Sequence, residues 1–221
     1  VSETTSFIIL HSRLPQAVVA VFCGASLSVA GLMLQTAFRN PLAGPSVFGI
    51  TSGASLAVAI VTLAVGTSTA IGGQITVVAA AFVGATAVTA LILALSAIVR
   101  SGVMLLIVGI MIGYLSSSAI TLLNYFASAD GMRSYMLWGM GDFGAVSSEQ
   151  LPVFVALSAL ALLSAVLLVK PLNALLLGER YAESLGVDVV SVRNWLLLST
   201  GLLSAVATAY CGPVSFLGLA V

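Results

Sequence analysis

The stretch FRNPLAGPSVFGITSGAS, residues 38–55, lies between two long apolar runs. It combines a basic residue, an asparagine, two prolines and three glycines. Proline ends a helix but is tolerated in the first turn of the next one, and glycine allows close backbone approach. We therefore expect one helix to end near Arg39 and another to begin near Pro45. The stretch predicts a structural joint between two apolar helices, without a chemical role of its own.

The overall composition indicates that these helices lie in a lipid bilayer. Of the 221 residues, 60% are hydrophobic and only 6% are charged, whereas about one quarter of the residues of a soluble domain are charged. The net charge is zero and there is no basic run, so no nucleic-acid partner is predicted. Cys23 and Cys211 both lie in apolar runs, and their positions predict no disulfide framework.

The apolar runs have the length of membrane-spanning helices, which need about 20 residues to cross the hydrocarbon core. Six complete spans are predicted, at 15–34, 46–65, 74–99, 103–126, 151–169 and 190–211. A seventh span would start at Pro213. We therefore expect an all-α polytopic membrane protein, in which residues 1–221 form a single helical domain. The chain begins without methionine and ends inside an apolar run, so we expect it to be a fragment of a longer protein.

The basic residues predict the orientation of the bundle. If the six spans alternate in direction, five of the seven basic residues share one face: Arg39, Arg100, Lys170, Arg180 and Arg193. Arg13 and Arg133 share the other face. Since cytoplasmic loops carry the excess of lysine and arginine, the first face is predicted to be cytoplasmic.

The two longest loops are predicted to contain short helices. The external loop 127–150 carries an aromatic and apolar patch around Trp138, which is typical of a helix at the membrane interface. The internal segment 171–189 is charged and is divided by Gly178 and Gly186, so it is predicted to form two short helices outside the membrane. Such a segment is either a solvated cap or a docking platform for a cytoplasmic partner.

Small and polar residues recur along several spans at helical spacing. Two such stripes are Gly24, Ser28, Gly31 and Gln35 in the first span, and Gly109, Gly113, Ser117, Thr121 and Asn124 in the fourth. Stripes of small residues mostly allow close packing of helices. The alternative is that some of them line a transport pathway, and for this role Ser117 and Asn124 are the candidates.

The sequence lacks the residues that two other classes of membrane protein need, ion-coupled transporters and intramembrane proteases. An ion-coupled secondary transporter would normally carry a charged residue in the middle of a span. The charged residues here lie outside the predicted spans or, like Arg193, within one turn of a span's end, although sodium coupling through backbone carbonyls stays an alternative. Gly139 to Asp142 spell the GxGD motif of intramembrane aspartyl proteases, which need two membrane-embedded carboxylates. Here Asp130 and Asp142 share one external loop, and His11 is the only histidine. We therefore predict no catalytic site, metal site or cofactor.

Four stretches of the chain together resemble the FecCD family, the permease subunits of ABC importers for iron–siderophore complexes, haem and vitamin B12. They are RLPQAVVAVFCGASLSVAGLMLQTAFRNPLAGPSVFGITSGAS (13–55), SYMLWGMGDFGAVSSEQ (134–150), LNALLLGERYAESLGVDVVSVRN (172–194) and the final CGPVSFLGLAV. Family members usually have ten spans, so this chain would lack the first span and the last two or three. The resemblance implies a multi-pass permease of the cytoplasmic (inner) membrane that carries an iron complex or cobalamin.

The resemblance also implies partners and site residues. A second permease subunit, two ATPase subunits and an external substrate-binding protein would complete the importer. The residues that match the family's ATPase-coupling pattern are Gly178, Glu179, Ala182, Leu185 and Gly186. Arg13 matches an arginine that can pair with glutamates of the binding protein, whereas Gln16 replaces a second arginine found in some relatives. The inner gate would lie at Gly102 and Val103, where the B12 permease has hydroxyl residues.

Overall fold

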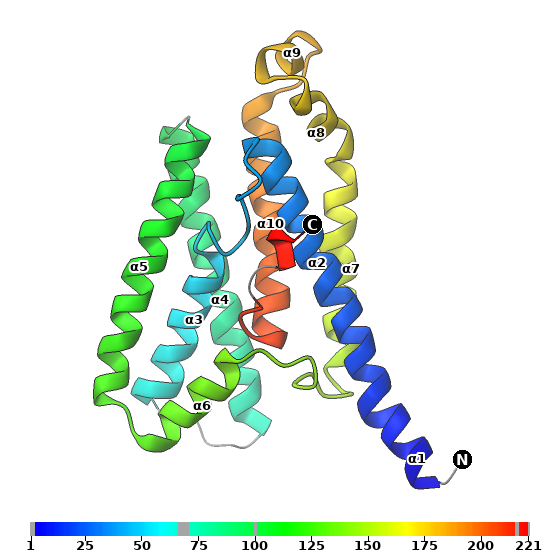
Figure 1. Ribbon diagram of the computed structural model, residues 1–221, viewed down its shortest axis with the longest axis vertical. Coiled ribbons are helices and arrows are strands. Elements are labelled where there is room, and N and C mark those ends of the chain that lie inside the picture. Colours follow the sequence, from blue (N-terminus) through cyan, green and yellow to red (C-terminus); the bar gives the residue numbers. More distant parts are fainter. Residues whose placement is uncertain (1–2, 66–70, 100, 215–216, 221) are drawn as a thin grey trace.

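The computed structural model describes residues 3–65, 71–99, 101–214 and 217–220, and these residues form helices joined by turns (Figure 1). The α-helices are α1 (Glu3–Ile8), α2 (Leu14–Phe38), α3 (Ile50–Ala59), α4 (Ile71–Ile98), α5 (Gly102–Phe126), α6 (Ala129–Gly139), α7 (Leu151–Leu167), α8 (Val169–Leu176), α9 (Glu179–Ser184) and α10 (Val189–Cys211). Two π-helical turns, η1 (Ile9–Arg13) and η2 (Ile60–Val65), and one 3₁₀ turn, η3 (Leu217–Leu219), complete the order. No strand occurs in these ranges, so the all-α prediction is confirmed.

Most of the predicted spans coincide with long apolar helices. Among the described residues, four helices are long and apolar enough to cross a membrane: Thr5–Phe38, Gly73–Ile98, Gly102–Phe126 and Val189–Cys211. Helices α7 and α8 form a fifth candidate if they are taken as one span, bent by 47°. The first of these helices begins well before the predicted residue 15, because α1, η1 and α2 follow one another without a break.

The second predicted span, 46–65, is shorter in the structure. Its helix begins at Ile50, because the preceding residues form tight turns in which the Val47 and Phe48 amides both donate to the Gly44 carbonyl. Gly49 has a left-handed φ of 76°, which no regular α-helix accommodates. The segment that follows α2 therefore returns from one end of the bundle to its middle, where α3 starts (Figure 1).

The chain also turns back after α10. Gly212, with a φ of 77°, ends this helix, and η3 then packs against α2 in the middle of the bundle (Figure 1). The side-chain amide of Gln35 donates to the Gly218 carbonyl at 3.1 Å. The described residues after Pro213, where a seventh span was expected to begin, form only this one 3₁₀ turn.

Helix α10 is the central helix of the bundle and packs against α2, α4 and α7. Its polar residues Thr200 and Ser204 are buried, and their hydroxyls donate to carbonyls of the same helix, those of Leu196 and Thr200, at 2.8 and 2.7 Å. Such bonds satisfy polar groups within a membrane span without a partner helix. The hydroxyls of Thr200 and Ser204 therefore need no hydrogen-bond partner on a neighbouring helix.

Glycines bring further pairs of segments into direct backbone contact. Gly53 of α3 and Gly84 of α4 lie so close that a Cβ atom on either would press on the carbonyl of the other. Gly31 of α2 lies in the same way against the carbonyl of Gly218. A methyl group on Gly24, which belongs to the same predicted stripe as Gly31, would have no neighbouring atom within 4 Å. The stripe on α2 therefore contains one packing glycine and one that faces open space.

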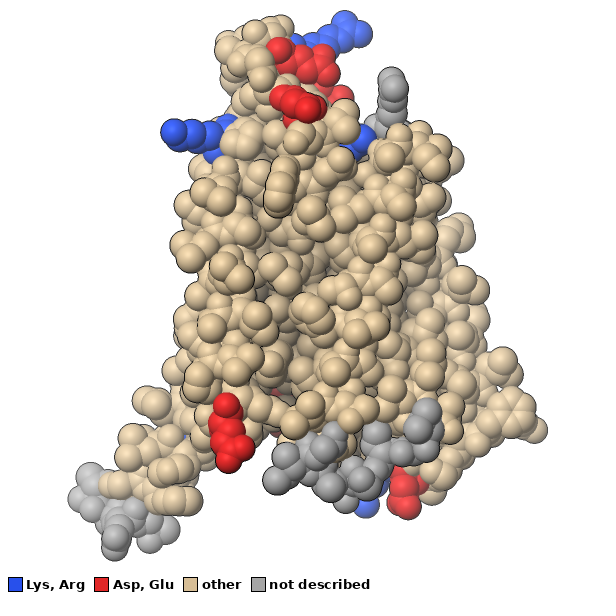
Figure 2. Space-filling model, turned by 180° about the vertical axis from the view of Figure 1, so that it is seen from behind, with Lys and Arg blue, Asp and Glu red and all other residues tan. Residues whose placement is uncertain are grey.

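On the face that Figure 2 shows, charged side chains gather at the two ends of the bundle, and an uncharged belt separates them. The end formed by the C-terminus of α2, by α8 and α9 and by the N-terminus of α10 carries Arg39, Lys170, Arg180 and Arg193. Arg13 and Arg133 belong to η1 and α6, which lie toward the opposite end. Arg100 lies outside the described residues. The grouping of these basic residues by end of the bundle matches the alternation from which the orientation was predicted.

Candidate functional site

The segment with the predicted ATPase-coupling residues forms one end of the molecule. Helix α9 lies at the tip of this end, beyond the ends of α2 and α10, and α8 leads up to it (Figure 1). Between α8 and α9, Gly178 has φ 124° and ψ 147°, a conformation that is essentially restricted to glycine. Gly178 thereby lets the chain reverse from α8 into α9, and its carbonyl accepts the Ala182 amide as the first turn of α9 forms.

A second glycine ends α9. Gly186 has a φ of 81°, and its amide donates to the Glu183 carbonyl at 2.9 Å. The Val187 amide donates to the Ala182 carbonyl at 3.0 Å, so the pair of bonds forms a Schellman motif. The carboxylate of Asp188 then accepts from the first amides of α10 and caps that helix. Gly178 therefore separates α8 from α9, and Gly186 ends α9, as the sequence predicted.

The side chains of this segment divide into an anchored and an exposed set. Ala182 is completely buried. Four large apolar side chains are more than half exposed, namely those of Leu176, Leu177, Tyr181 and Leu185. Glu179, Arg180 and Glu183 are exposed beside them. An exposed apolar patch with charged neighbours, outside the uncharged belt of the bundle, is typical of a surface that binds another protein.

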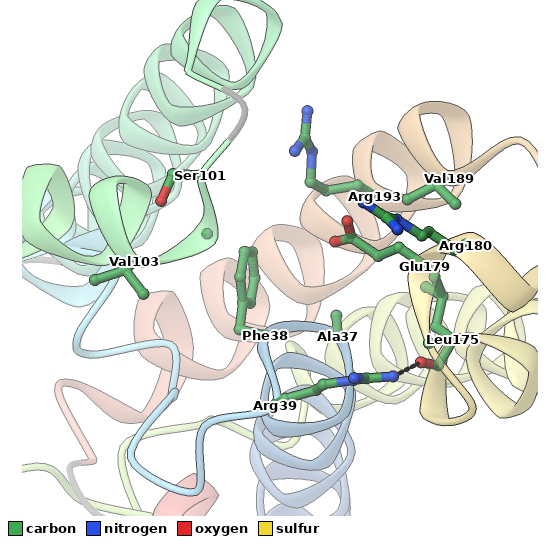
Figure 3. Close-up of a pocket in the computed structure, with 12 residues that line it drawn as sticks. Ala37, Phe38, Arg39, Ser101, Val103, Leu175, Glu179, Arg180, Val189 and Arg193 are labelled. Atoms are coloured by element: carbon green, nitrogen blue, oxygen red, sulfur yellow. Dashed lines mark hydrogen bonds between the residues drawn. The ribbon is translucent and has the colours of Figure 1, made fainter. Parts of the chain in front are cut away.

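A cavity of about 470 Å³ lies directly beneath this segment (Figure 3). Its lining includes Gly178 and Glu179 from the predicted coupling set and Gly102 and Val103 from the predicted gate. The sequence had placed these two groups on separate loops, and the tertiary structure brings them together. The other lining residues are Ala37, Phe38, Arg39, Ser101, Leu175, Arg180, Val189 and Arg193.

The predicted gate residues form the wall of this cavity at the start of α5. The Ser101 hydroxyl caps α5 by accepting the Met104 amide at 3.4 Å. Gly102 packs on the ring of Phe38, whose Cδ1 lies 2.5 Å from the position that a Cβ on Gly102 would take. Val103 is exposed. A side chain at position 102 would therefore require the Phe38 ring to shift.

Arg39 lines this cavity and makes a long-range contact with α8 that the sequence does not predict. Its Nη2 atom donates to the Leu175 carbonyl at 2.9 Å (Figure 3). The same atom donates to the Leu176 carbonyl at 3.1 Å. These are the last carbonyls of α8, and they lie 136 and 137 residues away in sequence. Three arginines and one glutamate line the cavity, so its charge is positive. No local pattern around Arg39 predicts this contact.

The predicted pathway residues on α5 lie apart from the internal cavity. Ser117 is exposed and lines a shallow hollow of about 510 Å³ together with Ser46, Gly113 and Tyr114. Asn124 is half-buried and is not part of that lining. The structure therefore places Ser117, and not Asn124, beside the turn that precedes α3. A role of either residue in transport stays a prediction.

The remaining residues considered in the sequence, Arg13, Asp142 and His11, lie outside the cavity beneath α8 and α9. Arg13 is exposed on η1, toward the end of the bundle opposite α8 and α9. The Asp142 carboxylate accepts the Gly144 amide at 2.7 Å within its own loop. His11 stacks on Phe7 with the ring centroids 4.4 Å apart. Within the described ranges, no three histidine, cysteine, aspartate or glutamate residues are grouped so that they could hold a metal ion.

Comparison with known proteins agrees with this architecture. The sequence profile of the FecCD transport family matches residues 1–221, the whole chain. The chain belongs to the FecCD transport family. The family resemblance predicted from the sequence is therefore confirmed, and this FecCD chain is a multi-pass membrane protein of a transport family.

Curated relatives and a solved structure are similar to the FecCD chain along nearly its full length. The vitamin B12 import system permease protein BtuC of Serratia proteamaculans is 35% identical over 224 residues, which cover 99% of this chain and 64% of the relative. The hemin transport system permease protein HmuU of Yersinia pestis is 34% identical over 213 residues, which cover 96% of this chain and 64% of the relative. The chain thus spans just under two thirds of the length of these relatives.

One similar solved structure is an inward-facing conformation of a transporter assigned to the metal-chelate ABC type. It superposes with a TM-score of 0.87 at 29% sequence identity, and the match covers 99% of this chain and 69% of the other. The arrangement of helices in the FecCD chain is therefore similar to that of a metal-chelate type ABC transporter.

Proposed function

We propose that the FecCD chain is part of a permease subunit of a binding-protein-dependent ABC importer. The cargo class is a bulky metal chelate, either an iron complex such as a ferric siderophore or haem, or cobalamin. The observation that carries this proposal is the exposed apolar patch of α8 and α9 at the end of the bundle, in a chain whose relatives include vitamin B12 and hemin permeases. The membrane is the cytoplasmic (inner) membrane.

The coupling segment supports the part of the proposal that concerns the ATPase. Leu177, Tyr181 and Leu185 present apolar side chains outside the bundle, and Glu179 and Glu183 are exposed among them. Burial of such a patch against a second protein provides the main favourable free energy of association. An ATPase subunit with a matching groove is the partner in this proposal. Two ATPase subunits would serve two paired permease subunits.

The opposite end of the bundle supports the part that concerns the binding protein. Arg13 is exposed there, on the helix that leads into α2. Its charge is available for a carboxylate of a substrate-binding protein. An exposed pair of this kind gives little affinity but fixes orientation, and it weakens as the salt concentration rises. Arg13→Glu is therefore expected to weaken capture of the loaded binding protein, and less so at high salt.

The test of the proposed function is uptake by the full-length protein. The protein would be reconstituted in proteoliposomes with the ATPase and binding protein encoded beside it, and uptake of a ferric siderophore, haemin or cyanocobalamin would be measured. We expect one of these cargoes to accumulate only when both ATP and the binding protein are present. Uptake that follows a sodium or proton gradient without ATP would instead identify an ion-coupled secondary transporter.

A second measurement addresses the coupling residues. Gly186→Val places a β-branched residue at a left-handed φ and is expected to distort the end of α9, whereas Glu179→Ala alters only the exposed face. Both variants are expected to lower substrate-dependent ATP hydrolysis. If both kept normal hydrolysis and uptake in a correctly assembled complex, docking of the ATPase at this segment would be refuted.

A further inference from the structure

Arg39 connects two parts of the chain that are far apart in sequence. One part is the coupling segment, and the other is the end of α2 with the turn that follows it. Arg39 Nη2 bonds to the carbonyls of Leu175 and Leu176, and it lies 3.4 Å from the position that a Cβ on Gly178 would occupy. The guanidinium therefore sits at the joint between α8 and α9.

The chemistry of the contact suits this position. The last carbonyls of a helix have no partner within the helix, and the C-terminal end of its dipole favours a positive charge. Arg39 supplies both a cation and hydrogen-bond donors to the end of α8. The Leu175 carbonyl also accepts the Gly178 amide at 3.0 Å, so the same oxygen holds the chain reversal and the arginine.

The backbone of Arg39 indicates that the arginine is present for its side chain. Its φ of 47° and ψ of 39° are left-handed, and it is the only non-glycine residue with a positive φ in the described ranges. Glycine or asparagine would adopt this conformation at a lower cost in free energy. A strained non-glycine residue persists where the surrounding contacts compensate for the strain. At Arg39, the amides of Arg39 and Asn40 donate to the Gln35 carbonyl and so end α2, and the side-chain contacts to α8 add to this compensation.

The turn after Arg39 is itself held firmly. The Asn40 side-chain oxygen accepts the Leu42 amide at 2.9 Å, and the Ala43 amide donates to the Asn40 carbonyl at 3.0 Å. The chain then reaches Ser46, which lines the hollow beside Ser117 of α5. A displacement of the α8–α9 joint would therefore reach this hollow through one side chain and a short, internally bonded turn.

We propose that Arg39 is a positioning residue that holds the α8–α9 joint of the coupling segment against the end of α2, so that the two move together. The inference deepens the proposed function and rests on it for the meaning of the movement. The contact itself does not depend on transport. The contact and the proposed function can therefore be tested separately.

The first experiment measures hydrogen exchange of the full-length permease in nanodiscs. Arg39→Gly relieves the backbone strain and removes the guanidinium, and Arg39→Lys keeps the charge. Arg193→Gln is the matched control, because Arg193 lines the same cavity but donates to the Ser96 carbonyl near the end of α4, at 2.9 Å. We expect the Gly178 amide to exchange about tenfold or more faster in Arg39→Gly, with Arg39→Lys intermediate and Arg193→Gln unchanged. If the Gly178 amide exchanged equally fast in Arg39→Gly and in the wild type, Arg39 would not stabilise the α8–α9 joint and the proposal would be refuted.

The second experiment measures cargo taken up per ATP hydrolysed in the reconstituted importer. In Arg39→Gly we expect hydrolysis to continue while uptake per ATP falls about fivefold or more, and we expect Arg39→Lys to restore part of the ratio. A purely structural role would lower hydrolysis and uptake together and leave the ratio unchanged, which would overturn the positioning role. Absence of ATP-driven uptake in the wild type would refute the proposed function instead, and the exchange experiment would still decide whether the contact exists.

Discussion

Gly31 and Gly24 lie on the same helix but have opposite surroundings, and this predicts opposite effects of the same substitution. A methyl group at position 31 would overlap the Gly218 carbonyl oxygen, a backbone atom that can move only with the whole 217–219 turn. A methyl group at position 24 would meet no atom within 4 Å. We therefore expect Gly31→Ala to destabilise the protein and Gly24→Ala to leave its stability unchanged or raise it.

The magnitude follows from three contributions. Overpacking against a fixed neighbour costs about 1–3 kcal/mol. Displacing the turn also breaks the bond from Gln35 to the Gly218 carbonyl, which adds about 1 kcal/mol. Both substitutions gain about 1 kcal/mol from the higher helix propensity of alanine, so this gain cancels when the two variants are compared. The expected difference in the free energy of unfolding is therefore about 2–4 kcal/mol.

The assay is unfolding of the full-length protein in mixed micelles by increasing SDS, followed by the fluorescence of Trp138 and Trp195. Gly24→Ala and Gly31→Ala would be measured side by side with the wild type. Equal free energies of unfolding for the two variants would contradict the close contact between α2 and the 217–219 turn. A loss confined to Gly24→Ala would contradict the whole assignment of which face of α2 is packed.

Three further predictions use the same unfolding assay or hydrogen exchange. Gly84→Ala presses on the backbone of Gly53 and is expected to lose about 1–3 kcal/mol, while Gly139→Ala, with nothing within 4 Å, changes little; equal losses would contradict the α3–α4 contact. Asp188→Ala removes the cap of α10 and is expected to destabilise its first turn by about 1 kcal/mol, seen as faster amide exchange there, and Asp188→Asn should restore most of it. The Ser158 hydroxyl is buried without a partner among the described residues, so Ser158→Ala is expected to keep or raise the stability by up to about 1 kcal/mol; a clear loss would reveal an interaction of this hydroxyl.

The spans were predictable because the bilayer imposes a length and a polarity that do not depend on tertiary contacts. About 20 apolar residues and internal hydrogen bonding suffice to specify a spanning helix. The prediction was less accurate for the span at 46–65, where the apolar run continues through residues that form turns. Hydropathy does not distinguish a buried turn from a helix. The left-handed Gly49 that ends the turn lies close to the carbonyl of Gly109, a contact that hydropathy does not reveal.

The helix ends of the coupling segment were also predictable, because Gly178, Gly186 and Asp188 act through bonds to residues within a few positions. The small-residue stripes were only partly informative. They identify faces that can pack closely, but they do not distinguish Gly31, which touches a backbone carbonyl, from Gly24, which touches nothing. The difference depends on the path of the chain after α10, far away in sequence.

By itself, the sequence determined the bilayer environment, the positions of most of the long apolar helices, the ends of the short helices and the family. These properties follow from composition, from interactions within a few residues and from the joint set of motifs. The tertiary structure alone decided that the chain returns to the middle of the bundle after α2 and again after α10. It alone decided that two predicted coupling residues, Gly178 and Glu179, line one cavity with the predicted gate residues Gly102 and Val103. It alone decided that Arg39 binds the end of α8. Each of these depends on contacts between residues far apart in the chain, for which a single sequence contains no local signal.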